Sequence, residues 1–145
     1  MKKLAALLLV AGFLFAFAPT ESETVENSAA IGESVTVSGT LVDTKCYGEM
    51  PKMNKGNEHT VMKDGQKMKM PNCATACANM GIPAAIATDD GETLTIIAPA
   101  GQLADHMAKE AKITGKIAFD GGIIPEKVEV KDGKKWSQVK LAYMM

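Results

Sequence analysis

Polar and apolar positions alternate most clearly over residues 33–43, ESVTVSGTLVD. Val35, Val37 and Leu41 are separated by serine and threonine, and this alternation predicts a half-buried β-strand. Gly39 lies inside the strand, where a glycine often marks a bend or a bulge. We therefore expect the first regular element of the chain to be a bent strand.

A long connection without a continuous strand pattern follows, over residues 44–72. Connections of more than about 12–15 residues in a compact domain are usually functional or disordered. Its second half, HTVMKDGQKMKM, contains the turn signal Asp64-Gly65, which predicts a β-hairpin. In that register His59 faces Met70. The position of His59 depends on this register, because a slip of one residue would turn its side chain to the other face of the hairpin.

A short helix is predicted over residues 73–80, within the segment NCATACANMGIP. Asn72 is a good N-cap residue, and Gly81 can take the left-handed conformation that ends a helix. Pro83 prevents the helix from continuing. The connection is therefore followed by a helix of about two turns that carries two cysteines.

The rest of the chain predicts more strands and one further helix. Apolar runs between turn signals indicate strands over residues 83–88, 93–98, 113–119, 126–130 and 136–143. A helix is expected from Pro99 to about Ala111. This order predicts a mostly β fold, a five- to six-stranded Greek-key barrel of the OB type. It has a helix between strands 3 and 4 and the short cysteine-bearing helix in its first long loop. The alternative is an open antiparallel α+β sheet.

The chain begins with the pattern of an export signal. Two lysines precede 15 uncharged residues, 4–18. This run is shorter than the roughly 20 residues of a membrane span and is typical of a signal peptide. We expect a signal peptide over 1–20, a disordered lead-in over 21–32 and one domain over 33–145, with a Met- and Cys-rich insertion at 44–82. The protein would then be periplasmic or secreted, with no membrane span after cleavage. An uncleaved anchor is the alternative.

Composition excludes several functions once the predicted signal is removed. Residues 21–145 hold 14 basic and 17 acidic residues, a net charge of −3, and only four aromatic residues. Nucleic-acid binding needs a basic surface with stacking aromatics, so we expect no nucleic-acid partner. The chain shows no glycine-rich phosphate loop and no Ser/His/Asp set. The sequence therefore favours a binding protein over an enzyme.

Three cysteines are an odd number for an exported protein, where thiols tend to oxidise unless a metal protects them. Cys73 and Cys77 are four residues apart and share one face of the predicted helix. Cys46 follows directly after the first strand. The first long loop can bring it toward the other two, so a set of three thiols is expected.

The predicted hairpin adds imidazole and thioether groups to these thiols. Six of the ten methionines lie between residues 50 and 80. One side of the hairpin would carry His59, Val61, Met68 and Met70. The expected metal ligands are Cys46, His59, Met68, Met70, Cys73 and Cys77. Three thiolates and an imidazole form a recognised zinc set, whereas thiolates with thioethers favour copper(I). Copper is the first expectation and zinc the alternative.

Two other interpretations use the same residues without a metal. Cys46 could pair with Cys73 or Cys77 in a structural disulfide, with the methionines filling a small core. The chain would then be an interaction module whose partner is another exported protein. Alternatively, Cys73 could attack as a thiolate in a redox protein, with Cys77 or Cys46 resolving. The chain lacks the CxxC motif of thioredoxin-like oxidoreductases, which disfavours that reading.

Three segments, LVDTKCYG, PNCATACANMGIP and AKITGKIAF, carry a family resemblance. They resemble small exported bacterial OB-fold proteins of uncharacterised function, which have a cysteine after the first strand and a later Cys-x-x-x-Cys pair. The resemblance covers residues 35–130. It implies a barrel and an extracytoplasmic setting, and it implies no particular activity.

Overall fold

The computed structural model describes residues 30–119 and 121–142. The predicted signal peptide, residues 1–20, lies outside the described residues, as does the part of the lead-in over 21–29. In the part of the chain that is described, no helix is both long and apolar enough to cross a membrane.

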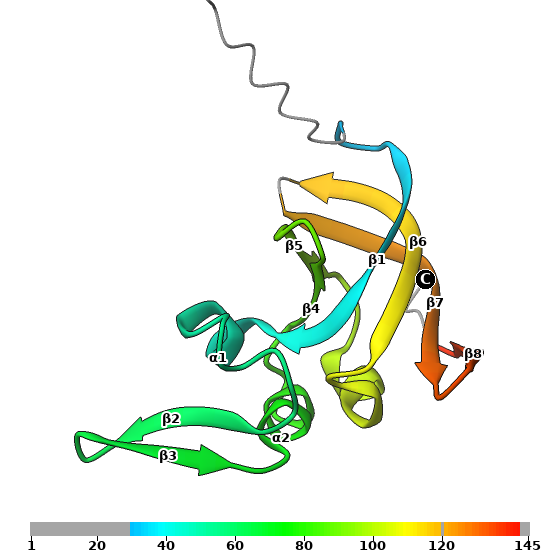
Figure 1. Cartoon of the computed structure of the whole chain (residues 1–145). Helices are drawn as coiled ribbons and strands as arrows, with labels where there is room; N and C mark the ends of the chain where they lie inside the picture. The colour runs from blue at the N-terminus through cyan, green and yellow to red at the C-terminus, as the bar shows by residue number, and fades with distance from the viewer. Residues whose placement is uncertain (1–29, 120, 143–145) are drawn as a thin grey trace, which may run out of the picture.

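The chain is mostly β, as predicted, and its elements follow one another closely (Figure 1). In chain order they are β1 (Ser34–Asp43), α1 (Thr44–Glu49), β2 (His59–Lys63), β3 (Gln66–Met70), α2 (Cys73–Asn79), β4 (Ala84–Thr88), β5 (Thr93–Ile96), the 3₁₀ helix η1 (Ala100–His106), β6 (Glu110–Phe119), β7 (Gly122–Asp132) and β8 (Lys135–Val139).

Six strands form one sheet in the order β5-β4-β1-β6-β7-β8, and every neighbouring pair in this order is antiparallel. A further parallel pairing joins β5 to β7, with Ile96 opposite Ile123. Strands β1, β4, β5, β7 and β6 therefore form a closed cycle of hydrogen-bonded pairs, and β8 extends from β7. The hairpin β2–β3 is a separate two-stranded sheet that projects from this body (Figure 1).

Two glycines allow the strands to approach closely. A Cβ atom at Gly39 would collide with the carbonyl group of Ala87 on β4, and one at Gly115 would collide with that of Ile124 on β7. The pairing of β6 with β7 also shifts register next to Gly115. The glycines predicted inside strands are therefore sites of close backbone contact, where a side chain would force the strands apart.

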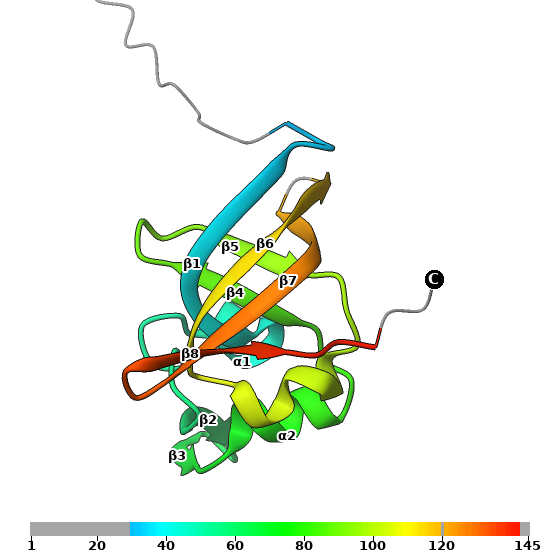
Figure 2. The same ribbon diagram turned by 90° about the vertical axis from the view of Figure 1, so that its right-hand side faces the viewer.

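The core lies on the inner face of the sheet and under two helices. Its largest fully buried apolar side chains are Leu41, Ile86, Ile96, Leu103, Ile113, Ile123, Val128 and Val130. α2 and η1 pack side by side across one end of the sheet (Figure 2). The hydroxyl of Thr75 on α2 donates to the carbonyl of Ala104 on η1 at 3.1 Å. This contact fixes the cysteine-bearing helix to the body of the fold.

The second predicted helix is shorter than expected and is a 3₁₀ helix. It ends at His106, and β6 already begins at Glu110, whereas the prediction extended the helix to Ala111. Ala108 takes a left-handed conformation, with φ of 66°, and its N–H donates to the carbonyl of Leu41. Pairing with β1 thus recruits the chain into the sheet before the helix can continue.

Other elements also differ from the sequence prediction. α1 was not predicted. β7 begins at Gly122 rather than at residue 126, and it accommodates Pro125 where the register shifts. β8 covers Lys135–Val139 and ends before the predicted residue 143, which lies outside the described residues. Strand pairing across the sheet decides the bounds of β7 and β8, and the local sequence does not encode that pairing.

Candidate metal centre

The predicted cysteine and histidine ligands come together where β1 ends, at one end of the sheet, among α1, β2 and α2 (Figure 1). Asp43 is the last residue of β1 and the N-cap of α1. Its Oδ1 atom accepts a hydrogen bond of 2.8 Å from the backbone N–H of Cys46. Capping by an aspartate starts the helix and sets Cys46 facing inward, where it is buried.

Asn54 fastens α1 to β2. Its Nδ2 atom donates to the carbonyl oxygens of Cys46 at 2.8 Å and of Thr60 at 3.3 Å. Its Oδ1 atom accepts from the N–H of Thr60 at 2.8 Å, and the residue is fully buried. His59 precedes Thr60 in the chain, so Asn54 fixes His59 relative to Cys46.

His59 opens the hairpin, and its side chain is fully buried. The predicted register is confirmed, with His59 opposite Met70 and Val61 opposite Met68. The Nε2 atom of His59 lies 2.8 Å from the carbonyl oxygen of Gly56. A carbonyl only accepts, so Nε2 carries the proton and donates this bond. In the neutral ring Nδ1 then has its lone pair free for a metal.

α2 presents two buried thiols, Cys73 and Cys77, on one face. The predicted helix bounds hold to within a residue, and Gly81 takes the left-handed conformation, with φ of 85°. Asn72 is the N-cap residue of α2, as predicted, but its side chain makes no capping hydrogen bond. Asn57 takes that role from the preceding loop, with Oδ1 accepting from the N–H of Thr75 at 3.0 Å.

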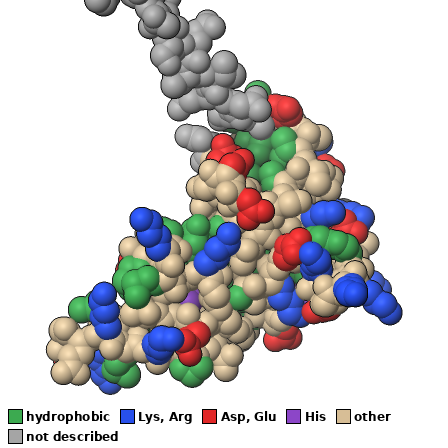
Figure 3. Space-filling view, viewed as in Figure 1, with side chains coloured by type: hydrophobic (Ala, Val, Ile, Leu, Met, Phe, Trp, Pro, Cys, Tyr) green, Lys and Arg blue, Asp and Glu red, His purple; other side chains and the backbone are tan. Residues whose placement is uncertain are grey.

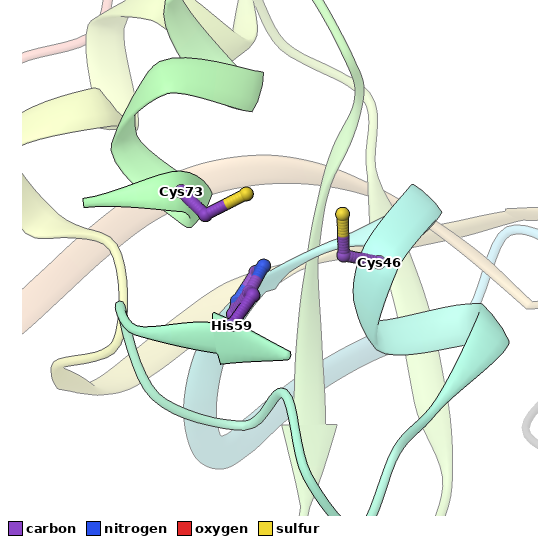
Figure 4. Close-up of side chains that lie close together, drawn as sticks. All are labelled: Cys46, His59 and Cys73. Carbon is purple, nitrogen blue, oxygen red and sulfur yellow. The ribbon is translucent and has the colours of Figure 1, made fainter. Parts of the chain in front are cut away.

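The cysteines and the histidine form two overlapping groups of donor atoms. In the first, the sulfur atoms of Cys46 and Cys73 and one ring nitrogen of His59 all lie within 4.8 Å of one another (Figure 4). In the second, a carboxylate oxygen of Asp43 and the sulfur atoms of Cys46 and Cys77 lie equally close. Cys46 belongs to both groups. None of the three cysteines forms a disulfide in the described structure.

The two predicted methionine ligands are placed differently. Met68 and Met70 lie on β3, which is exposed along its whole length, and their exposed fractions are 43% and 44%. Hydrophobic and lysine side chains are intermixed over this hairpin (Figure 3). The structure thus brings the thiols and the imidazole together in the interior and leaves both thioethers exposed at the surface.

The protonation of the thiols follows from their surroundings. Burial raises the pKa of Cys46 above its usual value, and the negative charge of Asp43 adds to this effect. Burial also raises the pKa of Cys77, to about 12, with Asp43 contributing next. Both thiols are therefore protonated at neutral pH in the metal-free protein. A metal ion that binds them must displace their protons.

Two buried polar atoms face each other at this site. Oδ2 of Asp43 and Nδ1 of His59 are 3.5 Å apart, and both side chains are fully buried. Among the described residues neither atom has a hydrogen-bond partner. Buried polar atoms are almost always paired. These two atoms belong to side chains that, with the nearby thiols, are close enough together to hold a metal ion.

Asp43 and Asn54 were not predicted as site residues. Asp43 had a usable signal, because an aspartate three residues before Cys46 at the end of a strand matches N-cap spacing. Asn54 had none, since its partners are known only once the loop is folded.

A zinc ion with bonds of about 2.0–2.3 Å sets its tetrahedral ligands roughly 3.3–3.8 Å apart. The observed donors therefore need only small movements to close on one ion.

No family model matches the chain, and no curated protein or solved structure matches it either.

Proposed function

We propose that this chain is an exported protein that binds one thiophilic metal ion between α1, β2 and α2. The observation that carries the proposal is the first donor group, in which Cys46, His59 and Cys73 hold their ligand atoms within 4.8 Å of one another. Three separate segments supply these three residues, so chance spacing along one element does not explain the arrangement.

The donor types select the class of metal. Thiolate and imidazole suit zinc and copper(I), whereas calcium and magnesium take oxygen ligands. Copper(I) is the first candidate cargo, because the exposed thioethers of Met68 and Met70 lie on β3, the strand paired with the one that carries His59, and offer a soft surface for this ion. Zinc is the alternative. The burial of the donors favours holding or sequestering the ion over catalysis, which needs an open coordination position.

The fold supports an OB-like assignment as part of this proposal. The cycle β1-β4-β5-β7-β6 closes through the parallel pair β5–β7. In chain order, η1 connects the third and fourth strands of that cycle, β5 and β6. The segment from α1 to α2 is inserted between its first and second strands, β1 and β4. The barrel then acts as a rigid frame, and the insertion carries the chemistry.

A second candidate function rests on the position of Cys46. Its sulfur lies within 4.8 Å of the sulfurs of both Cys73 and Cys77. A small movement would allow a disulfide with either one, as a disulfide-stabilised interaction module or a thiol-redox protein would require.

Anaerobic titration separates these candidates. Copper(I) and zinc are each added to the reduced protein in competition with a chromogenic chelator. We expect one ion per chain, with affinity sharply reduced in Cys73→Ser and His59→Gln. His106→Gln is the matched control, because His106 lies in η1, outside both donor groups. Failure of the reduced wild type to bind either ion would overturn the proposal.

A further inference from the structure

The buried pair Asp43 and His59 adds a fourth donor to the site. We propose that Asp43 is a metal ligand which zinc uses and copper(I) does not, in the set Asp43, Cys46, His59 and Cys73. This inference rests on the proposed function and deepens it, since it assigns the residue by which the site distinguishes a divalent ion from a monovalent one.

Asp43 has one oxygen engaged and one free. Oδ1 accepts the N–H of Cys46, so this oxygen and the carboxylate plane are fixed by the start of α1. Oδ2 is buried and has no hydrogen-bond donor among the described residues. A buried carboxylate oxygen without a donor is strongly unfavourable. The backbone thus holds this oxygen in the interior, aimed at whatever cation the site contains.

His59 is arranged in a complementary way. The bond from Nε2 to the carbonyl of Gly56 orients the ring and leaves Nδ1 facing Oδ2 of Asp43 at 3.5 Å. Metal-bound histidines commonly donate their other ring N–H to a backbone carbonyl in this manner. A metal ion lying against both atoms would give each of them a partner.

The remaining ligands follow from the two donor groups. Cys46 is close to an oxygen of Asp43 and to a ring nitrogen of His59, and Cys73 is close to Cys46 and His59. Together these residues offer one oxygen, one nitrogen and two sulfurs. This is a set of four that tetrahedral zinc accepts. Cys77, near Asp43 and Cys46, then stands beside the set and is not needed to complete it.

Charge and hardness explain why the two ions would use Asp43 differently. A carboxylate oxygen is a good zinc ligand, whereas copper(I) prefers sulfur and nitrogen. Two thiolates and a carboxylate carry three negative charges. Zinc leaves the buried site with one net negative charge and copper(I) leaves it with two, and buried uncompensated charge is costly.

The test is Asp43→Asn, measured against both ions. Asparagine is also a good N-cap, so α1 is expected to form in the variant. We expect zinc affinity to fall about 100-fold, which corresponds to about 2.7 kcal/mol. Copper(I) affinity is expected to change by less than about threefold. Asp105→Asn, at an exposed position on η1, is the matched control.

Each outcome decides the inference. An equal loss for both ions would show that Asp43 acts only through the structure, and an unchanged zinc affinity would show that it is no ligand. Either result overturns the inference and leaves the proposed function standing. A wild type that binds neither ion removes the proposed function as well.

Zinc X-ray absorption on the wild type needs no variant and covers the case in which Asp43→Asn fails to fold. Two sulfur and two lighter ligands per zinc would support the set. Three sulfurs would overturn it, because Cys77 would then occupy the place assigned to Asp43.

Discussion

The six-stranded sheet and the insertion between β1 and β4 bury different kinds of side chain. Inside the sheet the large buried residues are aliphatic. The buried polar or charged residues among those described are Asp43, Asn54, His59 and Thr60, and all lie between the end of β1 and the start of β2. Conversely, exposed methionines gather on or beside the hairpin. The insertion thus departs from the usual pattern of apolar inside and polar outside, because it buries polar side chains and exposes methionines.

This difference indicates that the sheet provides stability and that the insertion provides the candidate metal site. The sheet buries apolar surface and closes its own hydrogen-bond cycle, so it needs no ligand to form. The insertion buries thiols and an imidazole next to the carboxylate at the end of β1, and the desolvation of these groups is offset only by specific partners. We therefore expect substitutions in the insertion to affect metal binding far more than they affect the stability of the sheet.

Cys46→Ser should give the largest effect, because Cys46 belongs to both donor groups. Affinity for copper(I) and for zinc is expected to fall by at least about 100-fold, while the circular dichroism of the metal-free sheet stays unchanged. Cys77→Ser provides the comparison, since Cys77 belongs to one group only and should lose less. Equal affinities for wild type and Cys46→Ser would remove this residue from the site.

Asn54→Ala should loosen the insertion without loosening the sheet. The change leaves the N–H of Thr60 and the carbonyl of Cys46 without their buried partner, at a cost of about 1–3 kcal/mol. Hydrogen exchange should show faster exchange in α1 and β2, with β1 and β6 unaffected. Asn79→Ala, at an exposed position, should change neither region. Uniform loss of protection across both regions would contradict their separation.

The metal-free protein should lose stability at alkaline pH through the insertion. The pKa of Cys77 rises from its usual 9.0 to about 12 on folding. A group whose folded pKa is raised contributes stability that is complete below its unfolded pKa and is lost as pH rises through the folded value. Chemical unfolding measured from pH 8 to 12 should show this loss, and Cys77→Ser should reduce it. An identical profile for the variant would contradict the assignment.

Replacing Met68 and Met70 together by leucine should have the smallest effect. Both thioethers are exposed at the surface, so equilibrium copper(I) affinity is expected to change by about threefold or less. A chelator competition measures this directly. A tenfold or greater loss would show that the hairpin closes over the ion and that the methionines are ligands, as the sequence pattern predicts.

Local signals predicted the hairpin and α2 well. Asp64 and Gly65 both take positive φ, at 50° and 78°, as the turn signal requires. This turn fixes the register that places His59 opposite Met70. Gly81 likewise ends α2 where its conformational freedom predicts.

Features set by distant contacts were not predictable in the same way. Asn57 caps α2 from a loop 18 residues before Thr75, and Asn54 joins two elements across the insertion. η1 is cut short because Ala108 bonds to β1. Asp43 is an intermediate case. Its capping role is local, but its free oxygen can be identified as a candidate ligand only from the packing of His59 against it.

The central claim is that Cys46, Cys73 and His59 make a metal site and that the cysteines do not form a disulfide. It is tested most directly by measuring metal content and free thiols together on the protein isolated without air. The account predicts one copper or zinc ion per chain and three titratable thiols after the metal is removed. A metal-free protein with a single free thiol would contradict it.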